Sequence, residues 1–139
     1  MSRYWRASAM GGVLAGTLGV QGHFANGLAA LYLATGQDIA CVSESAMGVT
    51  RLEAKPDGSL YAAVTLPNLI VGSVGGGTGL PSARACFEIL GIEPGVDGSA
   101  NALAEVIAAL CLAGELSISA AIAAGQFAEA HRRLARGPA

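Results

Sequence analysis

The chain has 139 residues, of which 53% are hydrophobic and only 13% are charged. This composition excludes intrinsic disorder, which requires low hydrophobicity and high charge. The length allows one domain with a hydrophobic core but not two. The formal net charge is −2, and the eight basic residues form no stripe, so we expect no nucleic-acid partner.

The low charge bears on assembly, and the 20 glycines bear on the local backbone structure. A chain this apolar should bury more surface than it can cover alone, so we expect a homo-oligomer. Glycine at about twice its average usage predicts tight turns or close approaches of the backbone.

Three cysteines, Cys41, Cys86 and Cys111, are widely spaced along the chain. Their number and spacing match neither a zinc site nor a small disulfide framework. We therefore expect no metal, reduced and buried thiols, and a cytoplasmic location. We also expect no signal peptide, because the first residues lead into no compact apolar region with a cleavage site.

Two long segments, residues 7–37 and 58–83, carry no formal charge, so membrane insertion has to be considered. Glycines and polar residues interrupt the first segment, whereas Pro67, Pro81 and a glycine cluster interrupt the second. We expect no membrane partner. A membrane-associated helical protein is the minor alternative, favoured only if the chain partitions with bilayers at neutral pH.

The first half of the chain predicts a lead-in, a helix and a hairpin, in that order. Residues 1–22 are interrupted by glycines and carry no capping signal. Residues 23–35 have a helical composition, and Gly36 follows as a C-terminal cap. Alternating and β-branched residues predict a β-hairpin across 49–74 around a Lys-Pro-Asp-Gly turn, with Pro67 at an edge or bulge.

The second half predicts a glycine loop and then helices. A helix should begin at Pro81 and run to about Leu90. The pattern is helical from Asn101 to Arg136, with Gly114 and Gly125 as breaks. The predicted fold class is therefore α+β, mainly helical, with one strand pair in a single domain spanning residues 1–139.

The glycine loop, residues 72–79, is the sharpest local feature. A strand, a glycine loop and a helix start would present free backbone N–H groups to a phosphate. The segment fits neither the dinucleotide fingerprint nor the Walker pattern, however. Phosphate binding and a purely structural tight turn therefore stay equally open.

Four polar side chains outside the loop are candidates for chemistry. Asp38 is either an exposed turn residue or a carboxylate held for a basic partner. His23 and Asn26, three residues apart, would share a helical face and could bind a ligand together. His131 is either a solvated helix residue or a proton donor near neutral pH.

Glu115 is the only charged residue between Glu105 and Glu129. A carboxylate in such an apolar helix must either have a partner or have a raised pKa. The simplest expectation is an ion pair between helices, with Arg51 or Arg84.

Three blocks of sequence carry a family resemblance: GHFANGLAALYLATGQD (22–38), LYAAVTLPNLIVGSVGGGTGLP (60–81) and LAGELSISAAIAAGQFAEAH (112–131). In their order and spacing they resemble the C-terminal part of the hydroxymethylglutaryl-CoA reductase family. That family reduces hydroxymethylglutaryl-CoA to mevalonate and CoA by two hydride transfers, usually from NADPH. The resemblance implies the C-terminal portion of the family's large substrate-binding domain, a partial catalytic region.

The resemblance also implies roles for single residues. Asp38, in a Gly-Gln-Asp motif, would be the catalytic aspartate, a buried carboxylate working beside a lysine and a glutamate. His131 would be the mobile histidine that protonates the departing CoA thiolate. His23 and Asn26 would contact the substrate. The implied cofactor-binding residues, for NADPH or NADH, are Gly72, Val74, Gly75, Gly76, Gly77 and Thr78.

The family's catalytic glutamate, catalytic lysine and small cofactor domain all precede the matched region. The only lysine here is Lys55, within a turn, where a buried catalytic role is implausible. We therefore expect a chain that is incomplete alone and that pairs with an N-terminal half. The alternative is a non-catalytic remnant or interaction module that retains part of a CoA or dinucleotide site.

Overall fold

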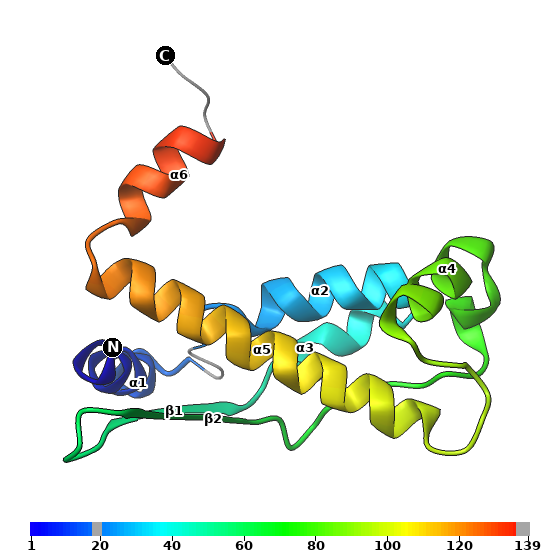
Figure 1. Ribbon diagram of the computed structural model, residues 1–139, viewed down its shortest axis with the longest axis horizontal. Coiled ribbons are helices and arrows are strands. Elements are labelled where there is room, and N and C mark those ends of the chain that lie inside the picture. Colours follow the sequence, from blue (N-terminus) through cyan, green and yellow to red (C-terminus); the bar gives the residue numbers. More distant parts are fainter. Residues whose placement is uncertain (18–20, 136–139) are drawn as a thin grey trace.

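The computed structural model describes residues 1–17 and 21–135, and in this part of the chain one β-hairpin lies along one side of the helices (Figure 1). In chain order, the elements are α1 (Ser2–Leu14), α2 (Phe24–Thr35), the 3₁₀ turn η1 (Ile39–Cys41), α3 (Val42–Ser45), β1 (Val49–Ala54), β2 (Leu60–Thr65), the 3₁₀ turn η2 (Gly76–Gly79), α4 (Pro81–Leu90), α5 (Ser99–Ala123) and α6 (Phe127–Ala135). The predicted class, α+β and mainly helical with one strand pair, is confirmed.

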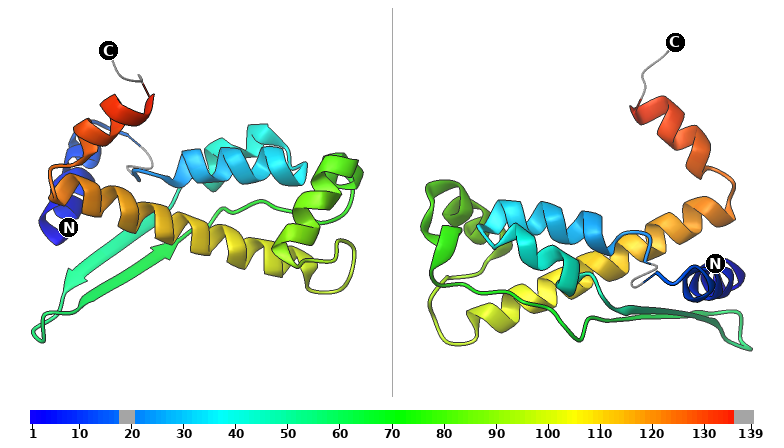
Figure 2. Two further views of the ribbon diagram at one scale, coloured as in Figure 1. Left: turned by 45° about the horizontal axis from the view of Figure 1, so that its top comes forward. Right: turned by 180° about the vertical axis from the view of Figure 1, so that it is seen from behind.

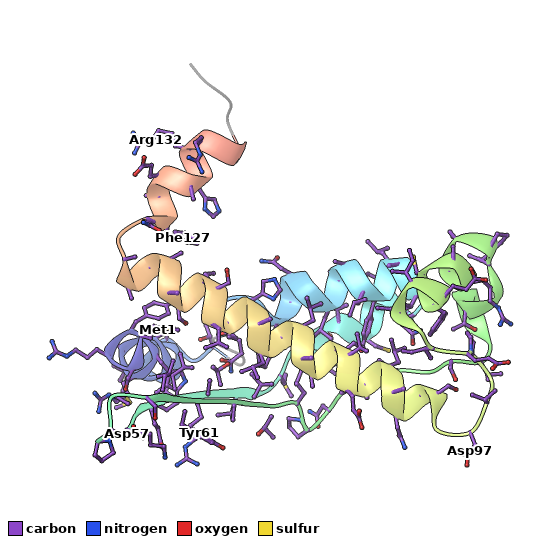
Figure 3. The ribbon with its side chains drawn as sticks, in the orientation of Figure 1. Met1, Asp57, Tyr61, Asp97, Phe127 and Arg132 are labelled. Carbon is purple, nitrogen blue, oxygen red and sulfur yellow. The ribbon has the colours of Figure 1, made fainter. Side chains whose placement is uncertain are left out.

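The long helix α5 is the axis of the molecule. It packs against α2 on one side and against β2 and α1 on the other, while α4 closes the far end of α2 (Figure 2). α6 contacts α5 but otherwise projects from the body, carrying Phe127 and Arg132 with it (Figure 3). The helices α2 and α6 therefore both lie against α5.

One stripe of α5 is buried along its whole length. Its members recur every four residues, as expected for one face of a helix; they are Ser99, Leu103, Ile107, Cys111, Glu115 and Ser119. Within the described residues, α5 is also the one helix long and apolar enough to cross a membrane. Core helices of soluble proteins pass the same test, so the expected lack of a membrane partner stays a prediction.

The core lies where α2, α4 and α5 meet. Its buried members are Phe24, Leu28, Tyr32, Phe87, Ile92, Leu103, Ile107 and Cys111. Burial raises the pKa of the Cys111 thiol to about 11, so this thiol stays protonated at neutral pH. The expectation of buried thiols is wrong for Cys41 and Cys86, which are only half-buried.

The hairpin is shorter than the sequence predicted. β1 and β2 are antiparallel, with Val49 opposite Thr65 and Ala54 opposite Leu60. Residues 66–74 continue as a loop, because β1 has no residue left to pair with them and Pro67 has no N–H to donate. The loop is fixed instead by side chains: the Tyr32 hydroxyl donates to the carbonyl of Ile70 at 2.7 Å.

The predicted C-terminal ends of two helices are confirmed, whereas the predictions for the N-terminal segment and for Gly114 are wrong. α2 and α4 end at Gly36 and Gly91, both left-handed, as the caps predicted. The glycine-rich start forms α1 instead of an irregular lead-in. The predicted break at Gly114 is also wrong, because α5 runs straight through this residue. The predicted break at Gly125 is confirmed, since α5 ends just before this glycine, which has φ +69°. The predicted end at Arg136 lies outside the described residues.

Candidate functional site

The first region of interest is the junction between the end of α2 and the glycine loop. The left-handed Gly36 turns the chain toward Asp38 and receives a hydrogen bond from the Gly77 N–H at 3.2 Å. A Cβ on Gly36 would overlap the Gly77 carbonyl group, and one on Gly77 would lie 2.9 Å from the Gly36 oxygen. Both positions therefore need glycine because two backbones touch there.

Gln37 joins the same two segments through its side chain. Its Oε1 accepts from the Gly72 N–H at 2.8 Å, and its Nε2 donates to the Gly72 carbonyl at 2.8 Å and to the Thr35 carbonyl at 3.2 Å. The amide thus satisfies both backbone groups of Gly72. Gln37 acts as a brace that holds the Asp38 turn against the glycine loop.

If Gln37 acts as a brace, the isosteric substitution Gln37→Glu should lower the stability of the chain. A carboxylate cannot donate to the carbonyl oxygens of Gly72 and Thr35, so we expect a loss of about 1–3 kcal/mol in the free energy of unfolding. Urea denaturation of the purified chain measures it. Gln126→Glu, at an exposed position, is the matched control and should change stability by less than about 0.5 kcal/mol. Equal effects of the two changes would contradict the assignment of Gln37 as a brace.

Asp38 is exposed, so the expectation of a buried carboxylate is wrong in this structure. Its Oδ1 accepts from the Ala40 N–H at 2.9 Å and caps the short turn η1. Partial burial and then the charges of Asp38 and Glu44 raise the pKa of the Cys41 thiol. Asp38 is thus held on the protein surface, at the rim of a pocket, by local backbone geometry.

This pocket is formed by both sides of the junction. Its lining residues are Gly36, Gln37, Asp38, Cys41, Ile70, Val71, Gly72, Val74, Gly75, Gly76 and Thr78. The lining contains one carboxylate and no lysine or arginine, so an anionic phosphate would depend on backbone N–H groups alone. The expected strand before the loop is also missing, since β2 ends at Thr65. The pocket therefore offers an anionic group no positively charged side chain.

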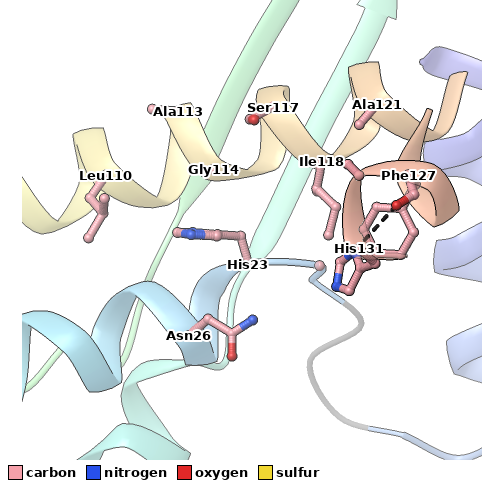
Figure 4. Close-up of a pocket in the computed structure, with 12 residues that line it drawn as sticks. His23, Asn26, Leu110, Ala113, Gly114, Ser117, Ile118, Ala121, Phe127 and His131 are labelled. Atoms are coloured by element: carbon pink, nitrogen blue, oxygen red, sulfur yellow. Dashed lines mark hydrogen bonds between the residues drawn. The ribbon is translucent and has the colours of Figure 1, made fainter. Parts of the chain in front are cut away.

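The second region is a larger cavity of about 660 Å³ between α5, α6 and the start of α2 (Figure 4). A cavity of this size accommodates a small-molecule ligand. Its wall is mostly apolar, and its lining residues are Gly22, His23, Asn26, Leu110, Ala113, Gly114, Ser117, Ile118, Ala121, Phe127, Ala130 and His131. The structure therefore brings His23, Asn26 and His131 together from distant parts of the sequence.

His23 is tightly enclosed at this wall. A Cβ on Gly114 would overlap its ring, and one on Gly27 would lie 2.9 Å from its Cε1, so two glycines make room for the imidazole. Among the described residues its Nδ1 is buried without a hydrogen-bond partner. A buried polar atom without a hydrogen-bond partner lowers the stability of the folded state unless a ligand or a water molecule bonds to it.

His131 lies on the opposite side of the cavity, on α6. Its side chain is exposed, with the ring centroid 4.4 Å from that of Phe127 and the Nδ1 3.3 Å from the Phe127 carbonyl oxygen. Asn26 is also exposed at the cavity, on the first turn of α2. Asp38 does not line this cavity, so the predicted site residues fall into two groups.

Glu115 does not form the expected ion pair. Arg51 bonds instead to Glu53 at 2.7 Å, and Glu115 accepts a hydrogen bond from the backbone N–H of His23 at 2.6 Å. Sequence reasoning also missed Gln37 and Gly114. An isolated glycine within a long helical pattern was the available signal for Gly114, because such a glycine often has a packing reason.

Sequence comparisons identify the family to which the chain belongs. The family profile described as hydroxymethylglutaryl-coenzyme A reductase matches residues 1–136. The chain therefore belongs to the hydroxymethylglutaryl-coenzyme A reductase family, an oxidoreductase family.

Individual relatives carry the same name. The chain is 50% identical over 131 residues to the 3-hydroxy-3-methylglutaryl-coenzyme A reductase of Aeropyrum pernix, covering 92% of this chain and 31% of the relative. It is 48% identical over 130 residues to that of Pyrococcus horikoshii, covering 91% and 32%. Reductase 1 of Dictyostelium discoideum is 42% identical over 130 residues, covering 88% and 23%. The chain thus spans about a third of the length of the archaeal relatives it matches.

Proposed function

We propose that this chain supplies the C-terminal part of a hydroxymethylglutaryl-CoA reductase active site, which converts hydroxymethylglutaryl-CoA to mevalonate and CoA. The observation that carries the proposal is the cavity walled by His23, Asn26 and His131, in a chain that belongs to this family. The unpaired Nδ1 of His23 and the mostly apolar wall fit a ligand with a few polar groups on an apolar frame.

In this proposal, His131 is the proton donor. It lies at the cavity on a helix that projects from the body, and its ring is exposed. Protonation of the departing CoA thiolate at sulfur stops it from attacking the aldehyde again. His23 and Asn26 hold the substrate's polar groups by hydrogen bonds.

Asp38 is proposed as the catalytic aspartate at the junction pocket. A carboxylate there biases the protonation of a neighbouring lysine or glutamate that stabilises the substrate oxygen. The lysine is not available locally, because the single lysine of the chain, Lys55, lies in the hairpin turn, 3.9 Å from Glu53. A second identical copy would carry only the same lysine, so in this proposal an N-terminal portion supplies the lysine, together with the family's catalytic glutamate.

The proposed cofactor is NADPH or NADH, held by the glycine loop. Of the predicted cofactor-binding residues, Gly72, Val74, Gly75, Gly76 and Thr78 line the junction pocket and would face it. Gly77 does not line this pocket, and its N–H donates to the Gly36 carbonyl. When bound, the nicotinamide supplies the hydride for each reduction. Beyond this, we keep as predictions a homo-oligomer or a pairing with an N-terminal half, a cytoplasmic location, and no nucleic-acid partner.

The test is NADPH and NADH oxidation in the presence of hydroxymethylglutaryl-CoA. We expect no turnover from the chain alone and turnover from a mixture with the N-terminal portion of an archaeal relative. Asp38→Asn should lower the activity of the mixture about 10²–10³-fold, the scale of removing one group that stabilises charge electrostatically. The control is Asp97→Asn, an exposed position outside the two site pockets.

Three outcomes would contradict this proposal. Turnover by the chain alone would show that no outside lysine is needed. Full activity of Asp38→Asn would remove the aspartate from the mechanism. Inactivity of every mixture, with a folded chain, would favour the alternative of a non-catalytic remnant or interaction module.

A further inference from the structure

Glu115 is a buried carboxylate that the proposed reaction does not use. It lies in the middle of α5 and is 5% exposed. Within residues 1–17 and 21–135, no lysine or arginine forms a salt bridge with it. A buried carboxylate without a cation needs another strong partner, since its burial is otherwise costly.

That partner is the beginning of α2. The His23 backbone N–H donates to Glu115 Oε1 at 2.6 Å, across 92 positions of sequence. His23 is the N-cap residue of α2, and its own side chain makes no capping hydrogen bond. Glu115 therefore places a negative group at the positive end of the α2 dipole, as a capping residue supplied by another helix.

The neighbouring residue, Gly114, fixes the His23 ring from the same helix turn. The ring occupies the space that a side chain at Gly114 would fill, and the cavity wall begins there. Figure 4 shows His23 between the start of α2 and the Gly114 segment of α5. Consecutive residues of α5 thus hold the backbone and the side chain of one cavity residue.

We propose that Glu115 is a positioning residue for His23. Its carboxylate anchors the His23 N–H, and through it the orientation of the imidazole and of Asn26 one turn further along α2. The link from this position to substrate binding rests on the proposed function. The anchoring itself does not, so the two can fail separately.

The test is amide hydrogen exchange by NMR on the full 139-residue chain. In Glu115→Ala, the His23 amide should exchange about tenfold faster, because it loses a hydrogen bond to a charged group. Glu115→Gln should recover part of this, to roughly threefold, since its amide oxygen still accepts a weaker bond. Glu105→Gln, the same change at an exposed position of α5, should leave the His23 amide unchanged.

If Glu115 only stabilised the fold in general, its replacement would speed amide exchange elsewhere in α5 as well as at His23. The amide of Ile107, in the core of α5, reports general loosening, and its exchange should stay the same in Glu115→Gln. Equal acceleration at Ile107 and His23 in both Glu115 variants would overturn the proposal, as would an unchanged His23 amide.

Hydroxymethylglutaryl-CoA, added to the same samples, separates the two proposals. We expect it to shift the His23 and Asn26 signals of the wild-type chain, and to bind about tenfold more weakly to Glu115→Ala. Absence of any shift in the wild-type chain would count against the proposed substrate, while the exchange data would still decide the role of Glu115.

Discussion

Gly36→Ala should be among the most damaging single substitutions in this chain. The new methyl would overlap the Gly77 carbonyl, at a backbone with φ +68° that side chains rarely adopt. Both costs act together, so we expect a loss of at least about 3 kcal/mol in the free energy of unfolding. Urea denaturation measures the loss, and the Gln37–Gly72 hydrogen bonds should break with it.

Gly91→Ala is the matched control for this prediction. Gly91 ends α4 with φ +68° and ψ 26°, almost the values at Gly36, but a Cβ there would meet nothing within 4 Å. Its replacement should cost only the left-handed strain, about 1 kcal/mol. If the two variants lose equal stability, the close approach of Gly36 to Gly77 has no energetic weight.

Gly114→Ala should separate function from stability. Alanine is the better helix former by about 1 kcal/mol, yet its methyl would occupy the position of the His23 ring. The imidazole has to leave the cavity wall, and a displaced binding group can lower activity roughly a hundredfold. The activity of the reconstituted mixture and the His23 ring signals in NMR spectra are the measurements.

A second mid-helix glycine provides the control. Gly11 lies inside α1, where a Cβ would meet nothing within 4 Å. Gly11→Ala should stabilise the chain slightly and leave activity unchanged. A Gly114→Ala variant that behaves in the same way would show that the close fit of His23 against α5 is not required.

The elements predicted correctly from the sequence have local signals at their ends. Gly36 and Gly91 mark the ends of α2 and α4, and the Lys-Pro-Asp-Gly turn marks the hairpin. Where the outcome depends on distant contacts, prediction failed. Gly114 does not break α5, and its lack of a side chain instead leaves room for the His23 ring at the start of another helix.

The candidate site was likewise predicted in part: its residues could be named from the sequence, but their distant contacts could not. The residue types and their resemblance to a family identified His23, Asn26 and His131, and the structure gathers them at one cavity. The sequence could not predict that Glu115 would bond to a backbone N–H 92 positions away. Nor could it predict that Asp38 would cap a surface turn, since both outcomes depend on packing between segments far apart in the chain.

The most direct test of the proposed active site compares two substrates of the reconstituted mixture, hydroxymethylglutaryl-CoA and the free aldehyde mevaldehyde. Only the thioester releases a CoA thiolate. His131→Ala should therefore lower thioester reduction by about 10²–10⁴-fold, the usual contribution of a general acid, and leave aldehyde reduction nearly unchanged. An equal loss on both substrates, or no loss on either, would contradict the role of His131 as the proton donor to the thiolate.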